Sequence, residues 1–188
     1  MSERRKIIVA GPGDVWFFAY GSLMWDPGFE PAEVRPALLR GWHRKFCVAS
    51  VIYRGKPEQP GLSLGLYHGG SCRGLALKIA AVEREEVLTY LADREMPEEI
   101  YSCRTVRLAT EEGVVDAQTL VVNRDHALYV PPMALGAMAA RIAHAAGKRG
   151  PNRDYLEQTV RHLDTLGIRD GLLHRLLDRV DKIPSRAG

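Results

Sequence analysis

A glutamate near the middle of the chain is the first residue whose type and position could do chemistry. Glu95 follows Arg94 at the end of a segment whose apolar residues fall on one helical face. A carboxylate acts as a general base when burial raises its pKa toward neutrality. Glu98 and Glu99 lie close by in the sequence and could do the same work, so spacing alone does not choose among the three. The alternative interpretation is a solvated residue at the end of a helix.

A glycine-serine loop is the second candidate. The sequence Tyr20-Gly21-Ser22-Leu23 follows the short aromatic run Val15-Trp16-Phe17-Phe18-Ala19. A strand that ends in such a turn can aim successive backbone N–H groups at one point, which makes a concave site for an anion. Gly21 would let a ligand approach the main chain closely, and the alternative is a plain turn. The sequence contains neither GxxxxGK[ST] nor GxSxG, so no motif supports a phosphate loop or a serine-hydrolase nucleophile.

A loop rich in proline and glycine offers a basic residue. Arg54-Gly55 is followed by Pro57 and by Pro60-Gly61 between two expected strands. Such loops often hold binding residues, and a guanidinium can form paired hydrogen bonds with a carboxylate. Arg54 is therefore a candidate for binding an acidic ligand.

Histidine and cysteine are too widely spaced for a metal or redox site. The sequence has no HExxH, His-x-x-x-His or CxxC pattern. We therefore expect no metal site, no cofactor, and reduced, buried cysteines. The residues concerned are His43, His68, His126, His144, His162, His174, Cys47, Cys72 and Cys103.

The composition and charge argue against some classes of partner. Hydrophobic residues make up 46% of the 188 residues and charged ones 26%, as in an ordinary globular domain. The net charge of +3 is spread along the chain, which argues against a nucleic-acid surface and suits an anionic small substrate. No stretch approaches the ~20 apolar residues of a membrane span. We expect a cytoplasmic protein with no nucleic-acid or membrane partner, and the sequence carries no signal for its oligomeric state.

The order of the expected elements predicts an α+β fold. Strands are expected over 15–19, 45–53, 62–67, 73–80, 101–109 and 114–122, with a hairpin turn at Glu111-Glu112-Gly113. Helices are expected over 83–93 and 132–146, in a segment capped by Asn152 and ending at Gly167, and in a last segment over 172–180. No linker divides the chain, so we predict a single domain over 1–188 with its core at about 14–182. In that domain helices cover a curved mixed sheet.

Taken in this order, the segments resemble the glutathione-specific γ-glutamylcyclotransferases, the ChaC-like family. The resemblance is close from Val15 to Trp25 and extends through shorter motifs to about residue 180. Those motifs are Gly41-Trp42-His43-Arg44-Lys45-Phe46-Cys47, Arg54-Gly55-Lys56-Pro57-Glu58-Gln59-Pro60-Gly61, Arg94-Glu95-Met96 with Tyr101, Leu128-Tyr129, Gly150-Pro151-Asn152-Arg153-Asp154-Tyr155-Leu156 and Leu166-Gly167-Ile168. Each motif alone is weak, but the ordered set is specific.

The resemblance implies a γ-glutamylcyclotransferase-like fold, in which helices surround a small, curved or barrel-like mixed sheet. It also implies a catalytic Glu95 and a segment that cradles the γ-glutamyl end of the substrate. The residues of that segment are Phe17, Phe18, Ala19, Tyr20, Gly21, Ser22 and Leu23. Arg54, Tyr101 and Tyr129 are further candidates for lining the pocket.

Two segments depart from the family pattern. Members usually have a glycine between the Arg-Glu pair and the tyrosine, whereas this chain has Met96-Pro97-Glu98-Glu99-Ile100. Leu62-Ser63-Leu64-Gly65-Leu66 lacks the arginine that often follows Pro-Gly. A proline and two acids in the first segment bear on substrate preference more than on the reaction.

The activity implied by the resemblance is the cleavage of glutathione into 5-oxoproline and cysteinylglycine. The free α-amine of the γ-glutamyl group attacks its own γ-carbonyl, so the enzyme needs no nucleophile, and the sequence shows no convincing one. Glu95 would take a proton from the amine and return it to the leaving nitrogen as a general acid/base. The alternatives are a cyclotransferase for other γ-glutamyl amino acids or amines, and a non-catalytic protein that binds a γ-glutamyl ligand.

Overall fold

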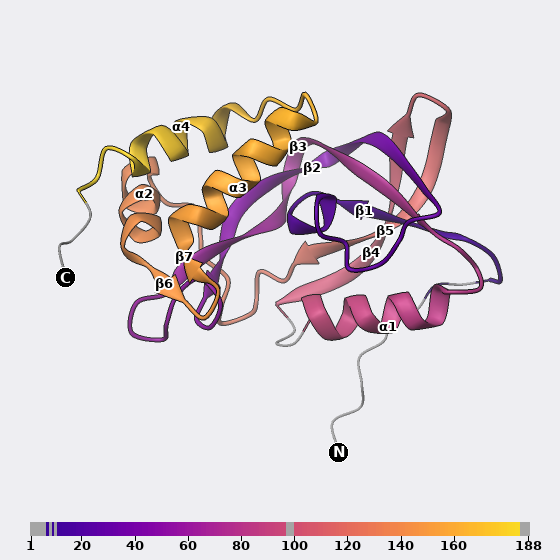
Figure 1. Ribbon diagram of the computed structural model, residues 1–188, viewed down its shortest axis with the longest axis horizontal. Helices are drawn as coiled ribbons and strands as arrows, with labels where there is room; N and C mark the ends of the chain where they lie inside the picture. The colour runs from indigo at the N-terminus through magenta and orange to yellow at the C-terminus, as the bar shows by residue number, and fades with distance from the viewer. Residues whose placement is uncertain (1–6, 8, 10, 97–99, 185–188) are drawn as a thin grey trace, which may run out of the picture. The chain divides into compact units, whose positions relative to one another are not determined.

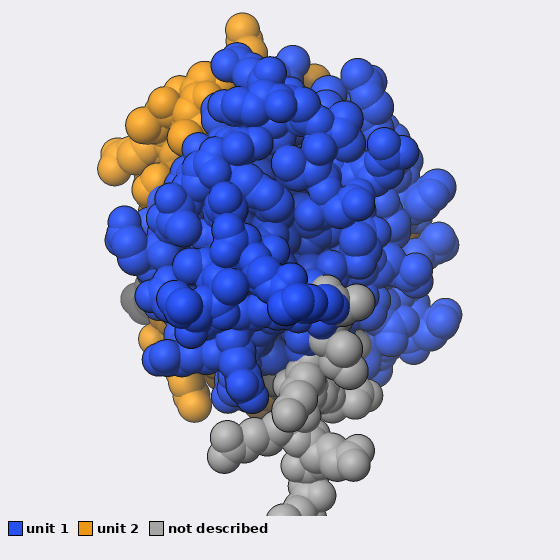
Figure 2. Space-filling view, turned by 90° about the vertical axis from the view of Figure 1, so that its right-hand side faces the viewer, with its two compact units in different colours: residues 1–45, 65–127 blue, residues 46–64, 128–188 orange. Residues whose placement is uncertain are grey.

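The computed structural model describes residues 7, 9, 11–96 and 100–184, so Pro97, Glu98 and Glu99 lie outside the described residues. The chain divides into two compact units (Figure 2). Unit 1 comprises residues 1–45 and 65–127, and unit 2 comprises residues 46–64 and 128–188. Two long strands, β2 (Glu33–Ser50) and β3 (Gly61–Ile79), contribute residues to both units. The single domain expected over 1–188 stays a prediction.

The strands close into a barrel of mixed direction. Its order is β1-β3-β2-β4-β5, where β1 is Val15–Ala19, β4 is Tyr101–Thr110 and β5 is Gly113–Val122. β1 is antiparallel to β3 and parallel to β5, and β4 is antiparallel to both β2 and β5. This arrangement confirms the expected α+β fold with a barrel-like mixed sheet.

An apolar cluster in unit 1 fills the barrel. Side chains alternate between the two faces of a strand, so each strand supplies inward-facing residues at every second position. The cluster is fully or nearly fully buried and comprises Phe18, Ala37, Leu39, Leu66, Cys72, Ala76, Leu108, Ala117 and Val121.

β2 and β3 are longer than the sequence suggested. The break expected between residues 67 and 73 is wrong, because β3 runs through Gly69 and Gly70 without ending. Both glycines have positive φ (99° and 69°), as does Gly41 in β2 (82°), so these residues bend continuous strands rather than ending them. The hairpin turn between β4 and β5 is confirmed, with Thr110 paired to Gly113 at its end.

Helix α1 (Arg84–Glu95) connects the end of β3 to the start of β4. Val87, Leu88 and Leu91 form its buried face, as the sequence pattern predicted. Acidic residues occupy its first turn and Arg94 its last turn, which suits the charge distribution of a helix dipole. Glu95 is the last residue of this helix.

Unit 2 contains the helices α2 (Leu135–His144), α3 (Asn152–Thr165) and α4 (Gly171–Val180), which pack against one another (Figure 1). The short strands β6 (Ala146–Gly147) and β7 (Gly150–Pro151) join α2 to α3. Gly167 follows the end of α3 with φ of 67°, which confirms the expected stop.

Asn152 does not cap α3 as predicted. It is the first residue of the helix, its side chain makes no capping hydrogen bond, and the residue is fully buried. Its Oδ1 accepts a hydrogen bond from the Leu62 N–H (2.6 Å), and its Nδ2 donates to the Leu62 carbonyl (2.8 Å). The side chain therefore satisfies both backbone groups of a buried strand residue, and that long-range demand outweighs local capping.

The contact between α3 and α4 is expected to make stability depend on pH. Nδ1 of His174 lies 2.6 Å from the Asp170 carbonyl oxygen, and its Nε2 lies 2.8 Å from Oδ1 of Asp164. The hydrogen bond to the Asp170 carbonyl and the nearby Asp164 carboxylate raise the pKa of His174, against the effects of partial burial and of Arg169. The imidazolium can donate to both oxygens at once, whereas the neutral ring can donate to only one.

Because the folded-state pKa is raised, this stabilisation is fully present below the ordinary histidine pKa and is lost as the pH rises through the folded-state value. We expect His174→Gln to reduce the free energy of unfolding at pH 5.5 and to have a much smaller effect at pH 8.5. Urea unfolding at the two pH values measures this. Asp164→Asn should remove most of the difference between the two pH values, and an equal loss at both would contradict the assignment.

Candidate functional site

Strand direction brings the main candidates to one end of the barrel. β1 runs parallel to β5 with Phe17 level with Gln118, so the carboxyl ends of both strands lie together. Tyr101, the first residue of β4, pairs with Val122, the last residue of β5. Helix α1 leaves the opposite end, where β3 pairs with the start of β1, and returns to the beginning of β4. The loop after β1, Glu95 and Tyr101 are therefore at the same end of the barrel.

The loop after β1 presents a row of backbone donors. Ser22–Met24 forms a short 3-10 turn (η1), in which the N–H of Met24 donates to the Gly21 carbonyl (2.9 Å). Trp25 and Asp26 both donate to the Ser22 carbonyl (3.1 and 2.9 Å). The N–H groups of Gly21, Ser22 and Leu23 have no hydrogen-bond acceptor among the described residues. Three successive donors of this kind suit a carboxylate or a developing oxyanion.

A buried arginine holds the start of this loop. Arg44 on β2 is 4% exposed, and its Nη1 donates to the Tyr20 carbonyl (3.0 Å). Its Nη2 donates to the Arg73 carbonyl on β3. Because a trans peptide points its C=O and the following N–H in opposite directions, fixing the Tyr20 carbonyl on Arg44 turns the Gly21 N–H away from Arg44. Arg44 thus sets the direction of the first donor in the row.

Glu95 is held by its neighbour in the sequence. Its Oε1 lies 2.8 Å from Nε of Arg94, and the two side chains are 24% and 14% exposed. A guanidinium in contact favours the carboxylate form, which is the form that can accept a proton. Nη2 of Arg94 also lies 3.5 Å from Oδ2 of Asp26, so the end of α1 contacts the segment that follows η1. Arg94 thus connects the candidate base, Glu95, to the loop over residues 20–26, which we call the donor loop.

The other residues of unit 1 that were predicted to bind substrate differ in how deeply they are buried. Phe17, Phe18 and Ala19 are buried β1 residues, and Phe18 belongs to the barrel core. Tyr20 and Tyr101 are half-buried. The direct contribution of these five residues to substrate binding stays a prediction.

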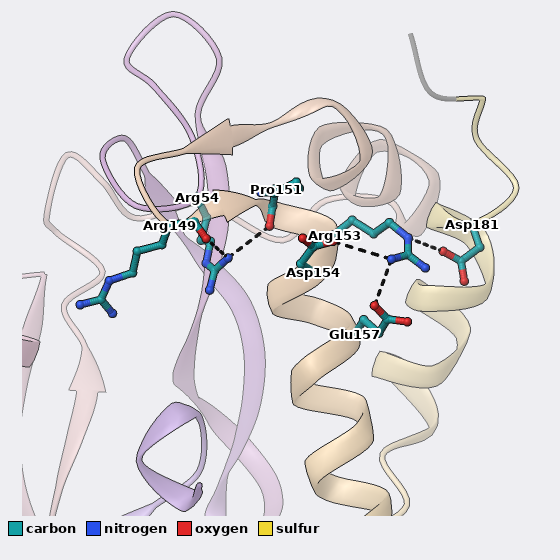
Figure 3. A network of polar contacts seen from close by, with 7 residues as sticks. All are labelled: Arg54, Arg149, Pro151, Arg153, Asp154, Glu157 and Asp181. Carbon is teal, nitrogen blue, oxygen red and sulfur yellow. Dashed lines mark hydrogen bonds and ion pairs between the residues drawn. The ribbon is translucent and has the colours of Figure 1, made fainter. Parts of the chain in front are cut away.

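Arg54 and Tyr129 belong to unit 2. Nη1 of Arg54 donates to the carbonyls of Arg149 (2.5 Å) and Pro151 (3.4 Å) (Figure 3). Its guanidinium also lies over the Tyr155 ring at 5.4 Å. Burial lowers the pKa of Arg54 from its ordinary value. Tyr129 forms an isolated bridge with Val48 at the end of β2. Arg54 thus ties the loop between β2 and β3 to the β6–β7 turn, and its pairing with a substrate carboxylate stays a prediction.

The described residues offer little support for other chemistry. Within them, no group of three or more His, Cys, Asp or Glu side chains is arranged to hold a metal ion. Cys47 and Cys72 are buried and form no disulfide, and Cys103, which forms none either, is only half-buried. Burial raises the pKa of the Cys103 thiol to about 11, which makes it a poor nucleophile near neutral pH. In the described part of the chain, none of the helices is both long and apolar enough to cross a membrane.

Three residues at this end of the barrel had no recognisable sequence signal. Arg44 lies in a strand where an arginine normally faces solvent, and only the structure shows it to be buried on two backbone carbonyls. Asp26 and Tyr90 are separated from Arg94 by 68 and 4 positions, respectively. The spacing of Tyr90 and Arg94 on one helix face was the one feature that could have suggested their contact.

Comparison with known proteins agrees with this fold and its motifs. A family profile described as ChaC-like protein matches residues 15–183. The glutathione-specific γ-glutamylcyclotransferase of Escherichia coli (strain K12) is 37% identical over 172 residues, covering 91% of this chain and 74% of that protein. The γ-glutamylcyclotransferase 2-3 of Arabidopsis thaliana is 33% identical over 182 residues, covering 92% of each chain.

The fold also matches a solved structure. The crystal structure of a γ-glutamyl cyclotransferase specific to glutathione from yeast superimposes with a TM-score of 0.84 at 22% identity, covering 90% of this chain and 96% of that one. This chain and that structure thus share one fold. The chain belongs to the ChaC-like protein family.

Proposed function

We propose that this protein is a γ-glutamylcyclotransferase that converts glutathione into 5-oxoproline and cysteinylglycine, with Glu95 as the general acid/base. The observation that carries the proposal is the joining of a carboxylate and a donor loop at one end of the barrel. Glu95 contacts Arg94, and Arg94 contacts Asp26 just beyond η1. The substrates named for the relatives in Escherichia coli and yeast support glutathione as the substrate.

Substrate binding would use the backbone of the loop. The γ-glutamyl group carries an α-carboxylate, an α-amine and a γ-carbonyl within one short flexible arm. The N–H groups of Gly21, Ser22 and Leu23 would bind either the α-carboxylate or the oxyanion that develops on the γ-carbonyl. Holding the arm folded removes rotational freedom before the reaction starts, and this ordering lowers the barrier to ring closure.

The chemistry then needs only proton transfer. At neutral pH the α-amine is an ammonium group, so the Glu95 carboxylate first takes one of its protons. The free amine attacks the γ-carbonyl carbon, a new C–N bond closes the five-membered lactam, and the bond to the cysteinyl nitrogen breaks. Glu95 returns its proton to that leaving nitrogen. The attacking nitrogen gives up a second proton when it becomes the lactam N–H, and the same carboxylate passes this proton to the freed amine, which leaves as an ammonium group. Atoms and charges balance without an enzymic nucleophile or a bound cofactor.

Substrate preference is tested by a panel assayed under identical conditions. We expect kcat/KM for glutathione to exceed that for γ-Glu-Ala and for a γ-glutamylamine by at least tenfold. Glutathione acetylated on its α-amine should give no product, because the attacking nitrogen is blocked. A higher kcat/KM for γ-Glu-Ala would keep the reaction and replace the substrate, whereas turnover of the acetylated compound would contradict intramolecular attack.

A further inference from the structure

Arg94 makes an unusual contact for its position in the chain. Adjacent residues of a helix point about 100° apart and do not normally face each other. Yet Nε of Arg94 lies 2.8 Å from Oε1 of Glu95, the next residue and the last of α1. The two side chains are therefore in direct contact although they leave the helix in different directions.

The other two nitrogens of the guanidinium are also engaged. Nη1 donates to the Tyr90 hydroxyl (2.9 Å), and Nη2 lies 3.5 Å from Oδ2 of Asp26. A Cβ on Gly28 would lie 1.9 Å from that hydroxyl, so Tyr90 is seated directly against the loop backbone. Asp26 in turn donates its N–H to the Ser22 carbonyl (2.9 Å). Each nitrogen of Arg94 thus meets a different partner on α1 or on the loop.

We propose that Arg94 is a positioning residue, which orients the Glu95 carboxylate, keeps it in its proton-accepting form and fixes it relative to the donor loop. A lysine presents its three donors from a single nitrogen, so it cannot reproduce the planar spread of the Nε, Nη1 and Nη2 contacts, and charge alone does not replace this arginine. The inference rests on the proposed function for its catalytic meaning, but the Arg94–Glu95 coupling itself can be measured without substrate.

Arg94 keeps its positive charge in the folded protein. Burial by itself lowers the pKa of Arg94, but the hydrogen bond to Tyr90 and the charges of Glu95 and Asp26 raise it above its ordinary value. The titratable groups that the described contacts place against the pair are Tyr90 on α1 and Asp26 on the loop. Removing the guanidinium takes away the positive charge that lies 2.8 Å from Oε1 of Glu95, while the negative charge of Asp26 remains.

The first experiment follows the Glu95 carboxyl carbon by NMR in protein carrying ¹³C-labelled glutamate, with the signal assigned by its loss in Glu95→Gln. We expect the titration midpoint to move upward by about one pH unit in Arg94→Met. Arg94→Lys should give a smaller shift, since it keeps the charge. Arg104→Met removes an exposed arginine of β4, so it serves as the matched control and should leave the midpoint unchanged.

The second experiment measures turnover of glutathione by the same variants as a function of pH. We expect kcat to fall at least tenfold in Arg94→Met, with the acidic limb of the profile moved to higher pH. Arg94→Lys should restore the acidic limb but not the full kcat. Tyr90→Phe removes the hydroxyl that accepts a hydrogen bond from Nη1 of Arg94. It should lower kcat and leave the acidic limb of the pH profile almost unchanged. A purely structural role would instead lower the folded fraction of Arg94→Met and leave the limb in place.

The outcomes separate the two proposals. An unchanged Glu95 midpoint in folded Arg94→Met would overturn the positioning role, even if the wild-type protein cleaves glutathione. If the Glu95 midpoint shifted in Arg94→Met but the wild-type protein did not turn over glutathione, the coupling would be supported and the proposed function refuted. Equal shifts in Arg94→Met and Arg104→Met would also overturn the inference, because they would reflect overall charge.

Discussion

Replacement of Glu95 by glutamine is expected to lower kcat for glutathione by about 10²–10⁴-fold, the range that general acid–base catalysis supplies. Glutamine has nearly the same shape, but it cannot take a proton from the substrate ammonium. It can still accept a hydrogen bond from Nε of Arg94, which lies 2.8 Å from Oε1 in the wild-type protein. We therefore expect KM and the circular dichroism spectrum to change little. Steady-state release of cysteinylglycine measures the effect.

Glu98→Gln and Glu99→Gln are the matched controls, because both residues carry the same chemistry within four positions of Glu95. We expect each to retain kcat within a few-fold of the wild type. If either control lost as much activity as Glu95→Gln, the proton-transfer role would have to be shared or reassigned. If Glu95→Gln stayed within a few-fold of the wild type, the role given to Glu95 would be wrong.

Asn152→Ala is expected to cause the largest loss of stability among the single substitutions considered. The change removes both hydrogen bonds to the backbone of Leu62, a residue with no exposed surface. Each buried backbone group left without a partner costs about 1–3 kcal/mol. We therefore expect the free energy of unfolding to fall by about 2–4 kcal/mol, which lowers Tm by roughly 5–15 °C in a protein of this size.

Asn123→Ala provides the comparison within the same chain. Asn123 uses its Oδ1 to accept one exposed hydrogen bond from the Asp125 N–H (3.1 Å), so its loss should lower Tm only slightly. Calorimetry on both variants tests the assignment. Equal Tm values for Asn152→Ala and the wild type would show that water or a neighbour replaces the amide, and that the buried pairing is dispensable.

Local chemistry made much of the fold predictable. The bounds expected for the first strand match β1 residue for residue, and the hairpin at Glu111-Glu112-Gly113 is correct because glycine supplies the positive φ that the turn requires. The apolar face of α1 was also readable from its spacing. The continuity of β3 was not, since Gly69 and Gly70 look like a break and only pairing across the barrel shows that the strand continues.

The site was predictable in its parts but not in its connections. The motifs pointed to the loop after β1 and to Glu95 separately, and only the structure shows that both lie at the same end of the barrel. The contact of Tyr90 with Arg94 follows the i, i+4 spacing of one helix, whereas the contacts of Arg44 and Asp26 had to be found in the structure, because their partners lie far away in the sequence. The same holds for Asn152, whose sequence context favours a helix cap while its partner is Leu62, 90 positions earlier.

The most direct test of the central claim is the identity of the products formed from reduced glutathione by the purified protein. Mass spectrometry of the reaction mixture should detect 5-oxoproline and cysteinylglycine in equal amounts and no free glutamate, because the γ-glutamyl group closes on itself rather than meeting water. Glutamate in place of 5-oxoproline would contradict the account and indicate hydrolysis. Saturable binding of glutathione without any product would contradict it as well and indicate a protein that binds γ-glutamyl ligands without cleaving them.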